Sequence, residues 1–222
     1  MCGRFVTVIS PEILAKIFGL IETPQLEPRY NVAPTQNVGV IRCFDDSGHN
    51  RFDLLKWGLV PSWSKDLSFG SHLINARSET VADKPAFRHA IKYRRCIIPT
   101  SGFYEWEHSG GKKQPYFIQL ADHSPMCLAG LWESWKAPDG SELESFAILT
   151  TAANKLVEPI HDRMPVILSP DAFNFWLSHN MHDPEQLKSL YQPFPASDMT
   201  AYKVPDLVNN PRFDSPACIA QV

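Results

Sequence analysis

The alternation of apolar and polar residues along the chain predicts many short strands. Apolar runs bounded by Gly, Pro, Asn, Asp and Ser are typical of strands in a partly buried sheet. The predicted strands are Arg95–Pro99, Gly102–Glu107, Tyr116–Leu120, Met126–Trp132, Ser145–Thr150 and Tyr202–Val204. A hairpin is also expected, in which the turn Asp45-Asp46-Ser47-Gly48 joins Val38–Phe44 to Arg51–Leu59.

Helices are fewer, and their capping residues place them. Ser10-Pro11-Glu12 begins a helix that Gly19 ends, because serine caps a first turn and proline fits its first position. Further helices are expected over Pro85–Tyr93, from Ser169 through Leu177, and from Asp183 onward. Many strands with few helices indicate an α+β fold, with a mixed, curved or barrel-like sheet flanked by a few short helices. We expect a single domain over residues 1–222, because no linker divides the chain.

Composition and charge narrow the classes of function. Of the 222 residues, 44% are hydrophobic and 20% are charged, as in an ordinary globular protein. No apolar run approaches the roughly 20 residues that cross a bilayer. Residues 1–20 show no signal pattern, so we expect a cytoplasmic protein with no membrane partner. A net charge of −3 argues against broad adhesion to duplex DNA, and it confines any nucleic-acid binding to one face.

Cysteine usage and motif patterns predict no bound metal and no cofactor. The five cysteines are scattered and never spaced C-x-x-C, so neither a disulfide framework nor a zinc site is expected. The sequence also has no match to the patterns for dinucleotide binding, phosphate-binding loops, zinc peptidases or serine hydrolases.

The first residues, Met1-Cys2-Gly3-Arg4, place a cysteine where removal of Met1 would make it the N-terminus. Its α-amine and thiol would then form a 1,2-aminothiol, which condenses with an aldehyde to close a thiazolidine ring. An α-amine has a pKa near 7.7–8.0 against about 10.4 for lysine, so its neutral fraction at pH 7 is on the order of 300-fold larger. The thiol is itself a strong nucleophile. A cysteine at position 2 can also be accidental, so the rest of the chain has to support this interpretation.

A carboxylate among aromatic side chains, in Gly102-Phe103-Tyr104-Glu105-Trp106, is a candidate acid or base. On an alternating strand, Phe103 and Glu105 share one face with Glu107, while Tyr104 and Trp106 lie on the other. Desolvation against an aromatic wall would raise the pKa of Glu105 toward neutrality, as general acid catalysis requires. The alternative is a strand glutamate that faces solvent.

Three further polar clusters lie in apolar surroundings. Asn75-Ala76-Arg77-Ser78-Glu79 directly follows an apolar pair. His161 lies with an Asp and an Arg in a segment bounded by prolines, where it is either a structural residue or a proton carrier. Trp57 suits a core position, whereas Trp63 lies between two serines beside Lys65. An exposed aromatic ring beside a cation can stack on nucleobases.

Together these segments resemble the SRAP family, the SOS-response-associated peptidase fold, some of whose members process abasic sites. The matching stretches occur in the family's order and cover essentially the whole chain. They are Met1-Cys2-Gly3-Arg4, Tyr30-Asn31-Val32-Ala33-Pro34, Asn75 with Arg77, Gly102-Phe103-Tyr104-Glu105-Trp106, Gln114-Pro115-Tyr116, Ile160-His161-Asp162-Arg163-Met164-Pro165 and Val208-Asn209-Asn210.

The resemblance implies a substrate and a set of roles. The substrate would be an abasic deoxyribose in single-stranded or junction DNA, whose C1′ is a masked aldehyde. Cys2 would attack through its amine and close the ring through its thiol, while Glu105 opens the sugar and transfers protons. Asn75 would position the reacting groups. His161 would assist proton transfer at the sugar, including during the slow reversal of the cross-link. The implied DNA contacts are Arg4, Asn31, Trp63, Arg77, Thr150 and Arg163.

Two other functions stay open at this point. One is a peptidase or amidohydrolase with Cys2 as N-terminal nucleophile, which would cut the bond before itself. The other is a passive single-strand binder, which fits poorly because no run of stacking aromatics with interleaved lysines is visible. In the favoured interpretation the protein is a monomer without metal or cofactor, and it joins the nucleoid when bound to DNA.

Overall fold

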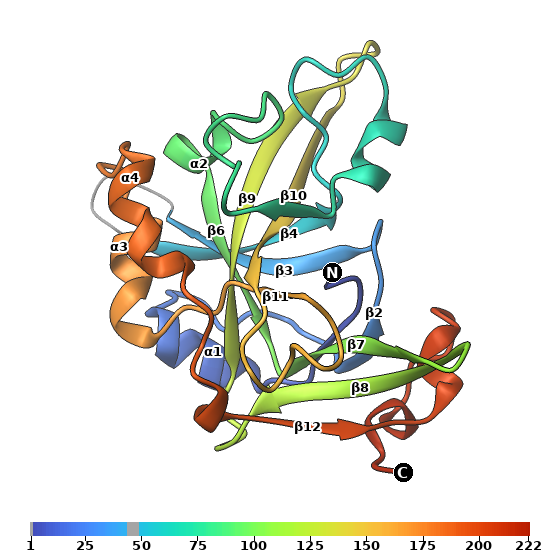
Figure 1. Ribbon diagram of the computed structural model, residues 1–222. Coiled ribbons are helices and arrows are strands. Elements are labelled where there is room, and N and C mark those ends of the chain that lie inside the picture. Colours follow the sequence, from blue (N-terminus) through green and yellow to red (C-terminus); the bar gives the residue numbers. More distant parts are fainter. Residues whose placement is uncertain (1, 44–48) are drawn as a thin grey trace.

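Five strands of the protein close into a mixed barrel. The computed structural model describes residues 2–43 and 49–222. Neighbouring barrel strands are antiparallel except for the parallel pair β4–β10, and pairing of β9 with β10 closes the ring. The barrel forms the upper part of the molecule in Figure 1. Its strands are β3 (Asn37–Cys43), β4 (Asn50–Trp57), β6 (Arg95–Thr100), β9 (Met126–Lys136) and β10 (Glu142–Ala152).

Two three-residue strands extend this sheet at the C-terminal end of β10. β5 (Asn75–Arg77) runs parallel to β10, and β11 (Arg163–Pro165) runs antiparallel to it. Thr150 of β10 therefore lies beside Arg77 on one side and beside Pro165 on the other. This arrangement gathers segments that are widely separated along the chain.

A second, antiparallel sheet lies below the barrel in Figure 1. Its inner residues Phe5 and Phe103 pack in one buried cluster with the barrel residues Trp57, Phe146 and others, and this cluster also contains Cys2. The strand order is β12 (Met199–Lys203), β8 (Lys112–Leu120), β7 (Gly102–Ser109), β1 (Phe5–Thr7) and β2 (Arg29–Val32).

The helices are short, as expected. α1 (Pro11–Phe18) begins where the Ser10 hydroxyl accepts a bond from the backbone of Ile13, at 3.4 Å, and it ends at Gly19 in the left-handed conformation (φ 60°). The other α-helices in the described ranges are α2 (Ala90–Tyr93), α3 (Phe173–Leu177) and α4 (Pro184–Leu187), and several short 3-10 helices accompany them. The expectation of an α+β fold with a barrel-like mixed sheet and a few short helices is confirmed.

The predicted helix over Pro85–Tyr93 is wrong in its first half. Residues 85–89 form turns, and a regular α-helix exists only over α2. The backbone N–H groups of Phe87 and Arg88 both donate to the carbonyl of Lys84, so three- and four-residue hydrogen bonds are mixed there. The turns bury Phe87 against the same core as Ala90 and Ile91. The apolar spacing that predicted a helix is therefore satisfied without one.

Other differences concern lengths. β9 ends at Lys136 rather than Trp132, and β10 begins at Glu142 rather than Ser145, so both strands of this hairpin are longer than predicted. The last strand, β12, begins at Met199 rather than Tyr202. The hairpin β3–β4 is confirmed, but its predicted turn Asp45-Asp46-Ser47-Gly48 lies outside the described residues.

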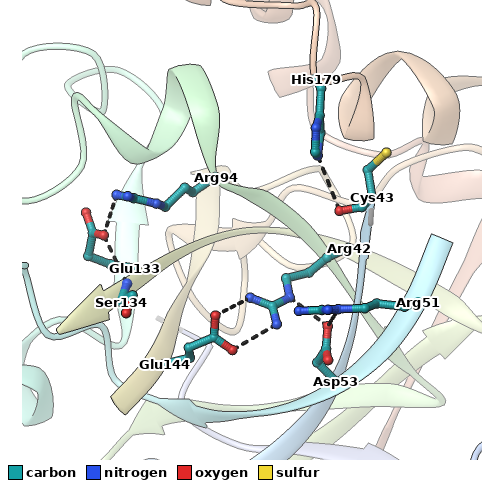
Figure 2. Close-up of polar contacts among 9 residues, drawn as sticks. All are labelled: Arg42, Cys43, Arg51, Asp53, Arg94, Glu133, Ser134, Glu144 and His179. Carbon is teal, nitrogen blue, oxygen red and sulfur yellow. Dashed lines mark hydrogen bonds and ion pairs between the residues drawn. The ribbon is translucent and has the colours of Figure 1, made fainter. Parts of the chain in front are cut away.

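A buried arginine joins four barrel strands at the end opposite to β5 and β11. The Arg42 guanidinium donates to both oxygens of Glu144, at 2.7 and 2.8 Å, and to Asp53, at 2.8 Å (Figure 2). It also lies 4.3 Å from the ring centre of Trp132. Along β10, Glu144 is about 20 Å from Thr150, at roughly 3.3 Å per residue. The network thus stabilises the barrel far from the segments that gather at the other end of β10.

Candidate active site

Cys2 lies three residues before the start of β1 and is fully buried, in the core cluster that contains Phe5 and Phe103. The Asn75 amide nitrogen donates to the Cys2 carbonyl at 3.0 Å, so β5 holds the backbone of the candidate nucleophile. The other carboxamide atom, Asn75 Oδ1, is buried and lacks a hydrogen-bond partner among residues 2–43 and 49–222. Burial raises the pKa of the Cys2 thiol above its usual range, and the charge of Glu105 raises it further. The thiol is therefore neutral until a base removes its proton.

Glu105 points into the interior from the middle of β7, and its residue is only 2% exposed. The predicted alternation is confirmed, because Phe103 packs with Cys2 while Tyr104 packs in a different cluster on the other face. Burial raises the pKa of Glu105 from 4.5 to about 7. The alternative of a solvent-facing glutamate is wrong. A carboxyl group with this pKa can both donate and accept a proton near neutrality.

His161 lies in the segment between β10 and β11. Its Nδ1 is 3.0 Å from the backbone nitrogen of Arg163 and 2.9 Å from a carboxylate oxygen of Asp162. One nitrogen cannot accept the first contact and donate to the second in the same protonation state. Burial lowers the pKa of His161, which favours the neutral ring that accepts from Arg163 and carries its proton on Nε2. The negative charge of Asp162 also contributes to the raised pKa of Glu105, which places this segment near that carboxyl group.

Asn154 shapes the segment that carries His161, and the sequence analysis missed it. Its Oδ1 accepts the backbone N–H groups of Leu156 and Val157, both at 3.0 Å. Its Nδ2 donates to the Phe194 carbonyl at 2.7 Å, which ties the segment to a distant part of the chain. Asparagine commonly organises turns in this way. That local preference is the signal that could have identified it.

Two of the predicted DNA contacts lie at the surface. Arg77 is exposed on β5. Trp63 is 57% exposed, and its ring meets the edge of Phe69 at a centroid distance of 5.6 Å. The loop of Trp63 is held by a 2.8 Å bond from the Trp135 indole to the Ser64 carbonyl, so it lies over the far part of β9. Trp63 thus lies on a loop beside Trp135, near the end of β9.

Arg163 and Thr150 form one unit at the end of β10. The Arg163 guanidinium donates to the Thr150 carbonyl at 2.7 Å, and Thr150 itself is fully buried. Through the register of β5 and β11 this unit lies beside Arg77. The two arginines and Asn75 therefore share one edge of the barrel.

Arg4 and Asn31 hold the C-terminal segment. Arg4 donates to the Asn31 side chain at 2.9 Å and to the Val208 carbonyl at 2.8 Å. The fully buried Asn31 donates in turn to the carbonyls of Asn210, at 3.0 Å, and Phe213, at 2.7 Å. These bonds join the segment Tyr30-Asn31-Val32-Ala33-Pro34 to the segment Val208-Asn209-Asn210. Direct contact of all six predicted residues with DNA stays a prediction.

The comparisons decide the family. The family described as "SOS response associated peptidase (SRAP)" matches residues 1–211. The chain belongs to the SRAP family. This SRAP chain is 43% identical to the abasic site processing protein YoqW of Bacillus subtilis (strain 168), over 99% of both chains. It is 37% identical to the abasic site processing protein YedK of Escherichia coli (strain K12), over 83% of both. The resemblance stated from the sequence is confirmed.

A solved structure supports the fold of the SRAP chain. The crystal structure of a protein from Bacteroides thetaiotaomicron matches it with a TM-score of 0.89 and 27% sequence identity, and the match covers 100% of both chains. Within the described ranges, none of the helices has the length and apolar character needed to cross a membrane. The same ranges contain no group of three or more His, Cys, Asp or Glu side chains arranged to hold a metal ion.

Proposed function

We propose that this protein processes abasic sites in single-stranded or junction DNA by forming a covalent thiazolidine through Cys2 after removal of Met1. Two relatives that match most of the chain are named abasic site processing proteins. The single observation that carries the proposal is the buried pair of Cys2 and Glu105, in which the carboxyl group has a pKa of about 7. This pair supplies a nucleophile and a proton carrier in one water-poor space.

The chemistry needs one aldehyde and releases one water. Glu105 removes the proton from the C1′ hydroxyl of the cyclic sugar, the C1′–O4′ bond breaks, and the proton is returned to O4′, which gives the open-chain aldehyde. The α-amine of Cys2 adds to C1′, and loss of water gives an imine. The Cys2 sulfur then adds to the imine carbon while its proton passes to the nitrogen, which closes the five-membered ring. Because the thiol is tethered to the same residue as the amine, closure is intramolecular and strongly favoured.

Neighbouring residues position the reacting groups through hydrogen bonds and charge. Asn75 fixes Cys2 through its backbone carbonyl, and its buried Oδ1 is available to the opened sugar or the amine. His161, neutral with a hydrogen on Nε2, can donate a hydrogen bond to the sugar oxygen. Arg77 and Arg163 stand at the same barrel edge, where they suit backbone phosphates, and Trp63 offers an exposed stacking surface.

The test uses an abasic oligonucleotide made by uracil-DNA glycosylase. Wild type is expected to give a product that survives denaturing electrophoresis, and Cys2→Ala to give none. Cys2→Ser keeps the amine without the thiol, so its product should persist only after borohydride reduction of the imine. Cys43→Ala, which removes a half-buried thiol from β3, is the control and should cross-link like wild type. Stable cross-linking by Cys2→Ala without reduction would refute the proposal.

Self-removal of Met1 is a second candidate activity, favoured by the peptidase name of the family and by the proximity of Glu105 to Cys2. If the protein cuts its own first peptide bond, the intact masses of Cys2→Ala and Glu105→Gln should include Met1 while that of wild type should not. Loss of Met1 from both variants would show that another enzyme removes it.

A further inference from the structure

The guanidinium of Arg163 forms a two-bond ion pair with the carboxylate of Glu79. Nη1 donates to one oxygen of Glu79 at 2.5 Å, and Nη2 donates to the other at 3.0 Å. Arginine binds phosphate groups with the same two-bond geometry. The Arg163 side chain is 11% exposed, whereas that of Glu79 is 52% exposed. Glu79 thus lies on the solvent side of the arginine, where a ligand would approach.

Arg163 has no second pair of N–H groups available for a two-bond contact. A further Nη2 hydrogen is taken by the Thr150 carbonyl at 2.7 Å. The Nε atom is buried and has no hydrogen-bond partner among the residues that the structure describes. Two parallel N–H bonds to a phosphate therefore require the position that Glu79 holds.

Glu79 also interacts electrostatically with both arginines of this edge. Only Ser78 separates it from β5 in the chain, and the hydrogen bond from Arg163 and the charges of Arg163 and Arg77 lower the pKa of its carboxyl group. It is therefore ionised at neutral pH, and its negative charge stands where a DNA backbone would run. An ion pair with one partner half exposed contributes little to stability, about 1 kcal/mol or less, so Glu79 can leave at small cost.

We propose that Glu79 is a specificity-determining residue that stands in for a DNA phosphate at Arg163 and must leave when DNA binds. The inference rests on the proposed function, because it takes Arg163 as a phosphate contact. Exchange of one anion for another gains little, and the displaced carboxylate stays near the negatively charged strand. Reversible binding to intact DNA is thereby weakened, while the covalent bond at an abasic site is unaffected. Glu79 thus favours damaged over intact strands.

The test is a fluorescence-anisotropy titration of an intact single-stranded oligonucleotide at several salt concentrations. Glu79→Gln is expected to bind up to about fivefold more tightly than wild type at low salt. Its affinity should also fall more steeply with salt, by about 0.7 in the logarithmic slope, because no freed carboxylate offsets the phosphate charge that Arg163 neutralises. Glu185→Gln is the matched control. It removes a carboxylate of α4 that pairs with Lys188 at 2.6 Å, and this variant should bind DNA like wild type.

Two further variants separate the charge of Glu79 from its support of Arg163. Glu79→Asp keeps the charge and should bind no more tightly than wild type, and Glu79→Gln combined with Arg163→Gln should lose the gain. The inference is overturned if Glu79→Gln binds as weakly as wild type or more weakly. It is also overturned if Glu79→Asp matches Glu79→Gln, or if the double variant keeps the gain. Absence of cross-linking to an abasic strand by both wild type and Glu79→Gln would instead refute the proposed function, whatever the titration shows.

Discussion

Glu105 is the residue whose surroundings most directly shape the proposed chemistry. Because its pKa is about 7, both of its protonation states are populated at neutral pH. Glu105→Gln should lower the initial cross-linking rate by about 10²–10⁴-fold and remove an inflection near pH 7 from the rate profile. The measurement is the rate of cross-link formation between about pH 5 and 9. Glu107→Gln, two residues along β7 and half-buried, is the control and should keep both the rate and the inflection.

The same carboxyl group should make stability depend on pH. A folded-state pKa of about 7 against an unfolded value near 4.5 means that the folded state binds the proton more tightly. Glu105 therefore lowers the free energy of unfolding progressively as pH rises from about 4.5 to 7, by up to about 3 kcal/mol. Glu105→Gln should melt at a higher temperature than wild type at pH 8 and show no such gain at pH 5. Equal gains at both pH values would contradict this account.

Among the elements, the segment between β10 and β11 depends most on one side chain. Asn154 caps its turn and ties it to Phe194, so Asn154→Ala should destabilise the protein by about 1–2 kcal/mol. Because His161 lies in this segment, cross-linking should also slow, while binding to intact DNA is kept. Asn154→Asp retains the Oδ1 that accepts from Leu156 and Val157 and should recover part of the rate. Thermal melting and cross-linking rates check both parts, and an unchanged rate in Asn154→Ala would show that the segment is held by other contacts.

The elements also show what the sequence could and could not predict. The long strands of the barrel and the cap of α1 were predictable, because burial on a strand and serine–proline capping leave local patterns. The three-residue strands β5 and β11 were not, because only their pairing with β10 defines them. Tertiary packing likewise replaced the predicted helix at Pro85 with turns.

At the scale of the whole molecule, the ion pairs that stabilise the barrel lie far from the candidate catalytic residues. Arg42 pairs with Asp53 and Glu144 at the end remote from Cys2. Arg42→Met should lower the free energy of unfolding by about 3 kcal/mol, because Glu144 loses both of its bonds to the guanidinium and Asp53 loses one of its two arginine partners. Cross-linking per folded molecule should not change. Arg51→Met is the control, since Arg51 pairs with the same Asp53 from a 43% exposed position and should cost less than about 1 kcal/mol.

The residues of the candidate site were easier to predict from the sequence than the contacts between them. Cys2, Glu105 and His161 stood out by residue type and neighbours, and Asn75 by resemblance. The pairing of Arg163 with Glu79 joins residues 84 positions apart, and the bond from Asn31 to Phe213 spans 182. Contacts of this range depend on the closed barrel and leave no local pattern. The extent of one SRAP domain over residues 1–222 stays a prediction.

The intact mass of the protein after mixing with an abasic oligonucleotide tests the central claim most directly. The proposal predicts a single adduct whose mass is that of the chain without Met1 plus the oligonucleotide, less one water. Peptide mapping should place the link on residue 2. An adduct that retains Met1, or one linked at any other residue, would contradict the account.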